Sequence, residues 1–332
     1  MYLADKIKVD ITIKDEEIDE YFIDSLDAMK KATCYVIKQE YKQKLDVNYK
    51  LNIKNDKASC KLVDYENDKY EVQLSYGIFK NLYSFYTQCF AEHNSGFFSS
   101  VYYGYPWNKE DAKNLNSTML RISLGYMILH ELGHIYSGQA KYKQDNNCIS
   151  DNLNKLFELY ADEFATTQLV SLYCHPNNVE DLSKKLSNGF DLKNMALLTL
   201  DSVIILWSIL GVGNKKLING SNYLSLRTRE YYYIKNMINI YDMLNYYNNN
   251  YVNEKLEDIE DKIIERAVVT ENMVNNTLNL IFNSDDYSII NNTEQMKKDF
   301  QDLDKNLEKK YISELPKILD DYKYVDILIN NI

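Results

Sequence analysis

The first hundred residues alternate between segments with a strand pattern and segments with a helical pattern. Hydrophobic side chains occupy every second position in residues 7–13 and again in residues 47–53, which is the period of a half-buried strand. Residues 60–75 predict two further strands joined by a polar turn. Hydrophobic residues recur at helical spacing in residues 15–45 and again after Gly77. We therefore expect an N-terminal part that combines a small sheet with helices.

Beyond a loop-like stretch at residues 95–111, nearly all of the chain follows a helical pattern. Only 10 Gly and 3 Pro occur among 332 residues, so few positions would break a helix. These patterns predict an α+β fold that is mainly helical. We divide it into an N-terminal α/β part at residues 1–115, a helical core at residues 116–240 and a helical C-terminal part at residues 241–332.

The most hydrophobic segment, residues 195–213, has the length of a short membrane span. Asp201 lies within it, and a carboxylate is costly at the centre of a bilayer. We therefore interpret the segment as a buried core helix and expect no membrane attachment. A membrane-associated protein is the alternative that a spanning helix would imply. In a core helix, Asp201 would need a partner, because an isolated buried charge is unfavourable.

The composition is that of an acidic globular protein. The net charge of −11 argues against nucleic-acid binding, because a protein neutralises phosphates with a basic surface. The five Cys are scattered without a Cys-x-x-Cys pair, so neither a disulfide framework nor a cysteine metal cluster is expected. The first residues lack the basic and hydrophobic regions of a signal peptide, and we expect a cytoplasmic protein.

The stretch His-Glu-Leu-Gly-His at residues 130–134 lies in a strongly hydrophobic segment that has the start and stop signals of a helix. Asn116 or Ser117 can cap its N-terminus, because a side-chain oxygen accepts hydrogen bonds from unpaired backbone N–H groups. Gly138 suits the left-handed position that follows a helix. The stretch is therefore expected near the C-terminal end of a central helix.

Residues four apart lie on one face of a helix, so His130 and His134 can direct both imidazoles at one metal ion. Glu131 lies about 100° around the helix, beside a metal-bound water, where it can accept a proton. The alternative is a pair of buried histidines that bind no metal. We favour the metal site, because random order would rarely produce His-Glu-x-x-His in a chain with 4 His.

A catalytic zinc ion usually has a third protein ligand. Neither His93 nor His175 stands where a third histidine would follow this motif, so a carboxylate is expected. Glu158 and Asp162 stand four apart on a second predicted helix. We expect Glu158 to be the ligand and Asp162 to accept the N–H of a metal-bound histidine. Glu163 is the alternative ligand, and a solvated acidic face is the alternative for the whole group.

The two motifs, His-Glu-Leu-Gly-His and Glu-Leu-Tyr-Ala-Asp-Glu-Phe-Ala, together resemble the gluzincin class of zinc metallopeptidases over residues 130–165. They are similar to the motifs of ImmA/IrrE-type peptidases and of the phage-exclusion Lit protease. The resemblance implies that Zn²⁺ is held by the two motif histidines and Glu158. It also implies Glu131 as the general base and Asp162 as the residue that orients a histidine.

The same resemblance implies a zincin-like core, in which a small mixed sheet precedes the motif helix and its edge strand pairs with an extended substrate. Residues 70–75 are our candidate for that strand, where binding would use backbone hydrogen bonds. Peptide hydrolysis also needs a donor for the tetrahedral oxyanion, and the resemblance implies a His, Tyr or Arg downstream. Tyr223, Arg227 and Arg229 are the candidates.

The hypothesis is therefore a cytoplasmic zinc endopeptidase that hydrolyses a peptide bond in an intracellular protein. Phage exclusion, stress signalling and repressor cleavage are possible settings that rest on the family resemblance alone. The alternative is a non-catalytic helical module that binds a protein partner and uses the metal for stability. Glu131 separates the two hypotheses, because a structural metal site does not need that carboxylate.

Overall fold

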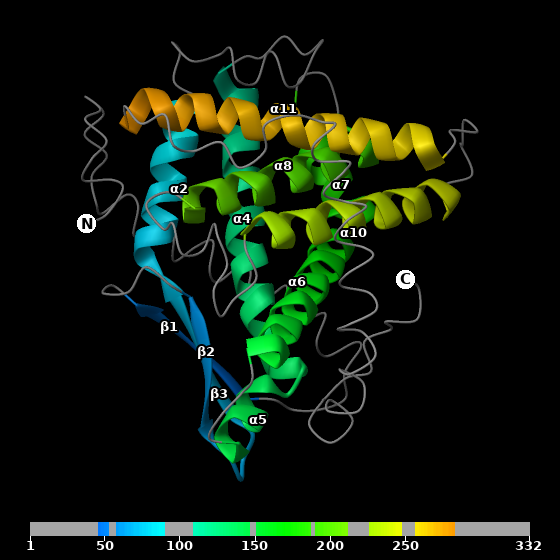
Figure 1. Ribbon diagram of the computed structural model, residues 1–332. Coiled ribbons are helices and arrows are strands. Elements are labelled where there is room, and N and C mark those ends of the chain that lie inside the picture. Colours follow the sequence, from blue (N-terminus) through cyan, green and yellow to red (C-terminus); the bar gives the residue numbers. More distant parts are fainter. Residues whose placement is uncertain are drawn as a thin grey trace.

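The computed structural model describes a small sheet and the helices that pack with it. The described residues are 46–52, 58–89, 109–146, 151–186, 190–211, 226–247 and 256–282. They form an α+β fold that is mainly helical and contains one small sheet, as the hydrophobic pattern predicts (Figure 1). The predicted strand at residues 7–13 and the predicted helix at residues 15–45 lie outside the described residues.

The sheet has three strands, β1 (Asp46–Asn52), β2 (Ser59–Asp64) and β3 (Lys69–Ser75), in the order β1-β3-β2. β1 runs parallel to β3, and β2 runs antiparallel to it, so the sheet is mixed. The predicted strands at residues 47–53 and 60–75 are thereby confirmed. However, the expectation that residues 70–75 form an edge strand is wrong, because β3 pairs on both sides and lies at the centre. β2 is an edge strand among the described residues.

The polar turn between β2 and β3 is stabilised by its own side chains. The carboxylate of Asp64 accepts hydrogen bonds from the backbone N–H groups of Glu66 and Asn67, both at 3.2 Å. Asp68 has a φ of 48°, in the left-handed region that Asp tolerates better than most residues. The pairing register shifts between Leu62 and Asp64, so the regular part of β2 ends before the turn.

The helices make up the rest of the described chain. They are α2 (Tyr76–Cys89), α4 (Lys109–Tyr136), α5 (Gln139–Asp145), α6 (Asp151–Tyr173), α7 (Pro176–Ser183), α8 (Leu192–Gly211), α10 (Leu226–Tyr247) and α11 (Leu256–Phe282). α4 packs against α6, and α8, α10 and α11 run across the upper part of the molecule in Figure 1. One hydrophobic cluster includes residues from β3 to α11. The expected boundaries at 115/116 and 240/241 fall inside α4 and α10.

The motif helix α4 begins earlier than its expected caps. Asn116 and Ser117 lie inside the helix, which starts at Lys109. Its first turn contains Glu110 and Asp111, and negative charge is favourable at a helix N-terminus. Asn and Ser have only slightly lower helix propensity than their neighbours, so the helix continues through them.

The predicted end of α4 is confirmed at Gly138. This residue adopts φ 75° and ψ 7°, the left-handed conformation that glycine takes without a steric cost. Its N–H donates to the carbonyl oxygen of Ile135 at 2.9 Å. The turn lets α5 follow α4 directly, which keeps α5 beside the end of the motif helix.

α8 has the burial of a core helix. It is long and apolar enough to cross a membrane, but 83% of its most hydrophobic 18-residue window is buried inside the protein. Asp201, only 1% exposed, is paired with Arg266 of α11, whose Nη2 lies 2.6 Å from Oδ2. The hydroxyl of Thr270 donates to Oδ1 at 2.6 Å. The partner that Asp201 needs is therefore supplied by α11.

Candidate metal centre

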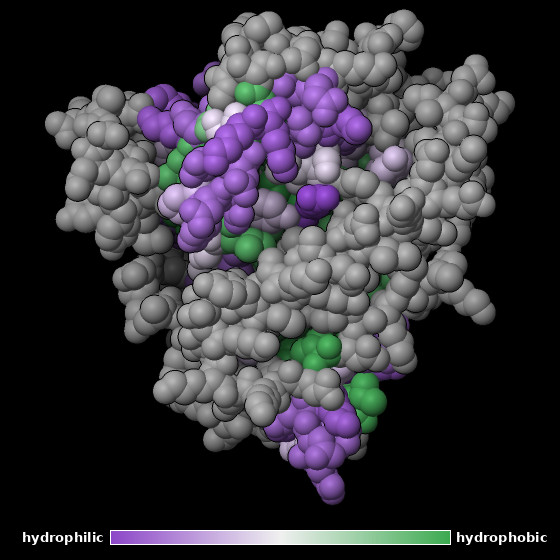
Figure 2. Space-filling model, turned by 180° about the vertical axis from the view of Figure 1, so that it is seen from behind, coloured by the Kyte–Doolittle hydropathy of each residue, from purple (hydrophilic) through white to green (hydrophobic). Residues whose placement is uncertain are grey.

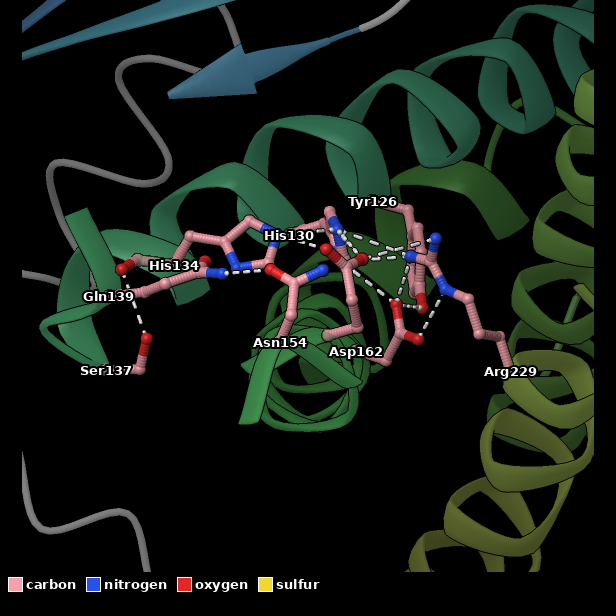
Figure 3. Close-up of polar contacts among 9 residues, drawn as sticks. Tyr126, His130, His134, Ser137, Gln139, Asn154, Asp162 and Arg229 are labelled. Carbon is pink, nitrogen blue, oxygen red and sulfur yellow. Dashed lines mark hydrogen bonds and ion pairs between the residues drawn. The ribbon is translucent and has the colours of Figure 1, made fainter. Parts of the chain in front are cut away.

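The candidate centre lies between α4 and α6, which pack in opposite directions and face each other with polar residues spaced by four. α4 contributes Tyr126, His130 and His134, and α6 contributes Asp162, Glu158 and Asn154 in the matching order (Figure 3). Because residues four apart share one helix face, each row points at the other helix. These contacts show that α4 and α6 pack antiparallel.

The two helices approach closely because small residues meet at their contact. A Cβ added at Gly133 would lie 2.7 Å from the Cα of Ala161 and 3.0 Å from its carbonyl oxygen. Both of these atoms belong to the backbone, so they cannot move aside as the end of a flexible side chain can. Glycine at position 133 therefore sets the distance across which the ligands converge.

Replacing Gly133 with Ala is expected to push α4 away from α6. The free energy of unfolding should fall by about 1–3 kcal/mol, the usual cost of overpacking, which urea denaturation measures. Affinity for zinc should fall about tenfold or more, because the ligands on the two helices separate. Adding Ala161→Gly should restore only part of both losses, since the nearest atoms are backbone. Full recovery in this double variant, relative to Ala161→Gly alone, would contradict the explanation.

Three side chains place donor atoms around one point. The Nε2 atoms of His130 and His134 are 3.1 Å apart. The carboxylate oxygens of Glu158 lie 3.5 Å from the Nε2 of His130 and 3.6 Å from that of His134. Two donors bound to one tetrahedral zinc ion would lie about 3.3 Å apart. Within the described ranges, these buried residues are the group whose possible ligand atoms all lie within 4.8 Å of one another, so they could hold a metal ion.

Asp162 orients His130 through the ring nitrogen that does not face the other donors. The Nδ1 of His130 lies 2.9 Å from the Oδ1 of Asp162. An N–H on Nδ1 can therefore donate to the carboxylate, which leaves Nε2 directed at the other donors. The hydroxyl of Tyr126 also donates to Oδ1, at 3.0 Å. This is the contact expected of Asp162, and such a contact fixes the tautomer and strengthens the histidine as a ligand.

Arg229 of α10 reaches the same carboxylate. Its Nε and Nη2 donate to the two oxygens of Asp162 at 2.8 and 2.7 Å. Its Nη1 lies 3.5 Å from an oxygen of Glu158, and its guanidinium lies 5.9 Å from the ring centroid of Trp207. Arg229 is thus at the site, as expected. Its closest contacts nevertheless hold Asp162 through a bidentate pair, which suits positioning of that carboxylate.

The two histidines of the centre differ in their affinity for protons. Burial and the charge of Arg229 lower the pKa of His130, but Asp162 outweighs them and the pKa rises to about 9. Burial lowers the pKa of His134 to about 3. The Nδ1 of His134 is buried and makes no hydrogen bond within the described part of the chain. A proton on this pair of imidazoles therefore resides on His130.

The carboxyl groups of the site also differ in their pKa. Burial raises the pKa of Glu131 to about 7, with Glu158 adding to the effect and His130 opposing it. Glu158 and Asp162 are also buried, but neighbouring positive groups hold the pKa of each below its usual range. Among these three, Glu131 is the carboxyl group that can exchange a proton near neutral pH.

Three of the sequence candidates take no place in the described centre. Tyr223 and the side chain of Arg227 lie outside the described residues. Glu163, the alternative ligand, does not belong to the converging group. Burial raises the pKa of Glu163 to about 7, and no ion pair with another described residue offsets this effect.

Two contributors to the centre were missed in the sequence. Tyr126 donates to Asp162, and Asn154 accepts a hydrogen bond from Gln139 at 3.2 Å. Tyr126 stands four residues before the first motif histidine, and Asn154 stands four before Glu158. The helical spacing that identified the ligands would therefore also have identified these residues.

The centre combines a converging donor set, an oriented histidine and a buried carboxyl group of raised pKa. Comparison of the chain with protein-family models, with curated proteins and with solved structures gives no match, so the function of this centre is inferred from its own residues.

Proposed function

We propose that the chain is a zinc-dependent endopeptidase that hydrolyses a peptide bond in a protein substrate. The observation that carries this proposal is the convergence of two imidazole nitrogens and one carboxylate beside the buried Glu131. Two His and one Glu are a frequent ligand set of catalytic zinc. Imidazole donors suit zinc, whereas Mg²⁺ and Ca²⁺ prefer oxygen ligands. The resemblance of both motifs to gluzincins supports the same assignment.

Each residue of the centre would have its own role in the reaction. His130, His134 and Glu158 would hold the zinc ion, which would polarise the peptide carbonyl and make water more acidic. Glu131 would accept the proton of the attacking water and pass it to the leaving amine. Arg229 holds Asp162 by two hydrogen bonds. Asp162 in turn would keep the first histidine directed at the ion.

β2 is the strand that fits an extended substrate. Among the described residues it is paired only with β3, and a peptide added along its other edge would bind through backbone hydrogen bonds. Burial raises the pKa of Cys60 on β2 well above its usual range, and the carboxylates of Glu131 and Glu158 raise it further. The strand also packs against the motif helix α4. This arrangement of edge strand and motif helix supports a zincin-like core.

The proposed substrate is an intracellular protein, and the proposed location is the cytoplasm. Phage exclusion, stress signalling and repressor cleavage are settings suggested by the family resemblance. A non-catalytic metal module fits the centre less well, because it would have no use for Glu131. Burying that carboxyl group is unfavourable, as its raised pKa indicates, and catalysis supplies a reason for it.

Zinc titration of the metal-free protein tests the proposed centre. We expect the wild type to bind one equivalent, and His130→Ala to lose this binding. Below pH 9 the ion must displace a proton from His130, whose pKa is about 9. Affinity should therefore rise about tenfold for each pH unit between about 7 and 9 and then level off. Competition with a zinc-binding dye at several pH values measures both effects.

One result of this titration would count against the proposed centre, and another would count against the protonation of His130. A wild-type protein that takes up no stoichiometric zinc would exclude zinc as the resident ion. An affinity independent of pH from 7 to about 9 would show that no proton leaves His130 when the ion binds.

A further inference from the structure

Four side chains join the turn after β2 to the helix that follows the motif helix. They are Lys141 and Asp145 on α5, and Tyr65 and Asp68 at the two ends of the turn; we call this group the α5 clamp. We propose that the α5 clamp positions the edge strand β2 for substrate binding. This inference rests on the proposed function, because it concerns how a peptide is held beside the metal centre.

The contacts of the α5 clamp hold both ends of the turn. Lys141 and Asp145 stand four apart, so they lie on the same face of α5. The Nζ of Lys141 lies 2.7 Å from the Oδ1 of Asp68 and 5.2 Å from the ring centroid of Tyr65. The hydroxyl of Tyr65 donates to the Oδ2 of Asp145 at 3.1 Å. One face of α5 thus holds the first and the last residue of the turn.

The pair of Lys141 and Asp68 differs from an ordinary surface pair. Their side chains are 21% and 37% exposed, and they connect elements far apart in the sequence. The side chains of Lys184 and Glu180 are 65% and 64% exposed, and this pair spans one turn at the end of α7, where Lys184 is the C-cap. Burial disfavours the charge of Lys141, but Asp68 outweighs it and raises the pKa of the amine. The pair of Lys141 and Asp68 therefore connects two separate elements, whereas the surface pair does not.

Both elements joined by the α5 clamp border the metal centre. α5 follows α4 directly through the turn at Gly138, and its first residue, Gln139, donates to Asn154 of α6. On the other element, β2 packs against the motif helix α4 and against α5. Figure 1 shows α5 beside the β2–β3 hairpin at the lower end of the molecule. The clamp therefore fixes β2 relative to the helices that carry the ligands.

β2 needs such support because its own pairing is short. Regular pairing with β3 covers Ser59 to Leu62 and is interrupted before Asp64. Val63, at this interruption, is 60% exposed. Figure 2 shows hydrophobic surface next to the hydrophilic tip of the molecule in this region. A short edge strand is marginally stable by itself. A peptide that adds to it binds better when the strand is already held in place.

Two inhibitors of the zinc-loaded, full-length protein distinguish the contribution of β2 to peptide binding from that of the metal centre. Acetohydroxamate reaches only the metal, whereas a tripeptide hydroxamate also extends along β2. In Lys141→Met we expect affinity for the tripeptide hydroxamate to fall about fivefold, the factor given by an interaction of about 1 kcal/mol. Affinity for acetohydroxamate should stay within about twofold. Lys141→Arg should restore peptide affinity, because it keeps the charge and can stack on Tyr65.

The matched control is Lys184→Met, which removes the same type of residue from the surface pair on α7 and should change neither affinity. Equal weakening of both inhibitors by Lys141→Met would overturn the proposal, and so would unchanged affinity for both. Deuterium exchange of the β2 amides gives a readout that needs no zinc. Exchange should be faster in Lys141→Met than in Lys184→Met, and equal exchange would show that the clamp does not hold β2.

The same experiments distinguish this proposal from the proposed function. If the wild type binds neither zinc nor acetohydroxamate, the proposed function fails and the substrate role of the clamp fails with it. If acetohydroxamate binds but the tripeptide hydroxamate gains nothing over it, the metal centre stands and only the role of β2 and its clamp is overturned.

Discussion

Replacing Glu131 with Gln should remove nearly all peptide hydrolysis and leave the zinc bound. Gln has nearly the same shape as Glu, but its amide cannot accept a proton from the attacking water. Loss of a general base typically lowers the rate by about 10²–10⁴-fold. Metal analysis measures the zinc content. A comparison of protein termini in cells that express wild type or Glu131→Gln identifies the substrate through ends that only the wild type produces.

Glu163→Gln is the matched control for Glu131→Gln. Glu163 is a half-buried residue whose pKa is also raised to about 7, but it lies outside the converging group. We expect this variant to retain both zinc and hydrolysis. Equal loss of activity in both variants would indicate a general effect of neutralising a buried carboxyl group. Wild-type activity in Glu131→Gln would exclude Glu131 as the base.

Replacing Asp201 with Ala should produce the largest loss of stability, about 3–5 kcal/mol, which is typical when one partner of a buried ion pair is removed. The side chain of Arg266 is 14% exposed, and two of its nitrogens bond to Asp201. Without the carboxylate, this mostly buried guanidinium loses the charge partner that it has among the described residues. The hydroxyl of Thr270 loses its acceptor as well. Urea denaturation of the zinc-loaded protein measures the free energy of unfolding.

A second variant shows whether the loss comes from the charge of Arg266 that Asp201 no longer balances. Replacing Asp201 with Leu and Arg266 with Met together removes both charges and keeps hydrophobic volume. This double variant should be markedly more stable than Asp201→Ala, because hydrophobic residues often replace a buried ion pair at little cost. If the double variant is as unstable as Asp201→Ala, the explanation through the lost charge partner of Arg266 is wrong.

The parts of the centre that depend on local spacing could be predicted from the sequence. His130 and His134 follow from one helical period, and Glu158 and Asp162 follow from the same period on the next helix. The structure brings these four residues together. Helical spacing determines which side chains share a face, whatever the rest of the fold does. Such predictions therefore need only the existence of the two helices and their antiparallel packing.

The parts that depend on distant segments could not be predicted in this way. Residues 70–75 have a clear strand pattern, but alternation does not reveal which strands lie on either side of a strand. β1 precedes β2 in the chain and still pairs with β3. Similarly, the sequence offered Arg229 as a candidate but not its bond to Asp162. The partner of Asp201 on α11 was equally hidden, because both contacts depend on how late helices cross earlier ones.

The three candidate ligands lie close together in the sequence, and this affects the order in which the centre assembles. The three candidate ligands lie within residues 130–158, whereas Asp162 and Arg229 are separated by 67 positions. Contacts between nearby residues form early, because closing a short loop costs little entropy. On the ribosome, α4, α5 and α6 are synthesised before α10. The ligand pair of helices is therefore a locally encoded unit that can form on the growing chain, and Arg229 adds to it afterwards.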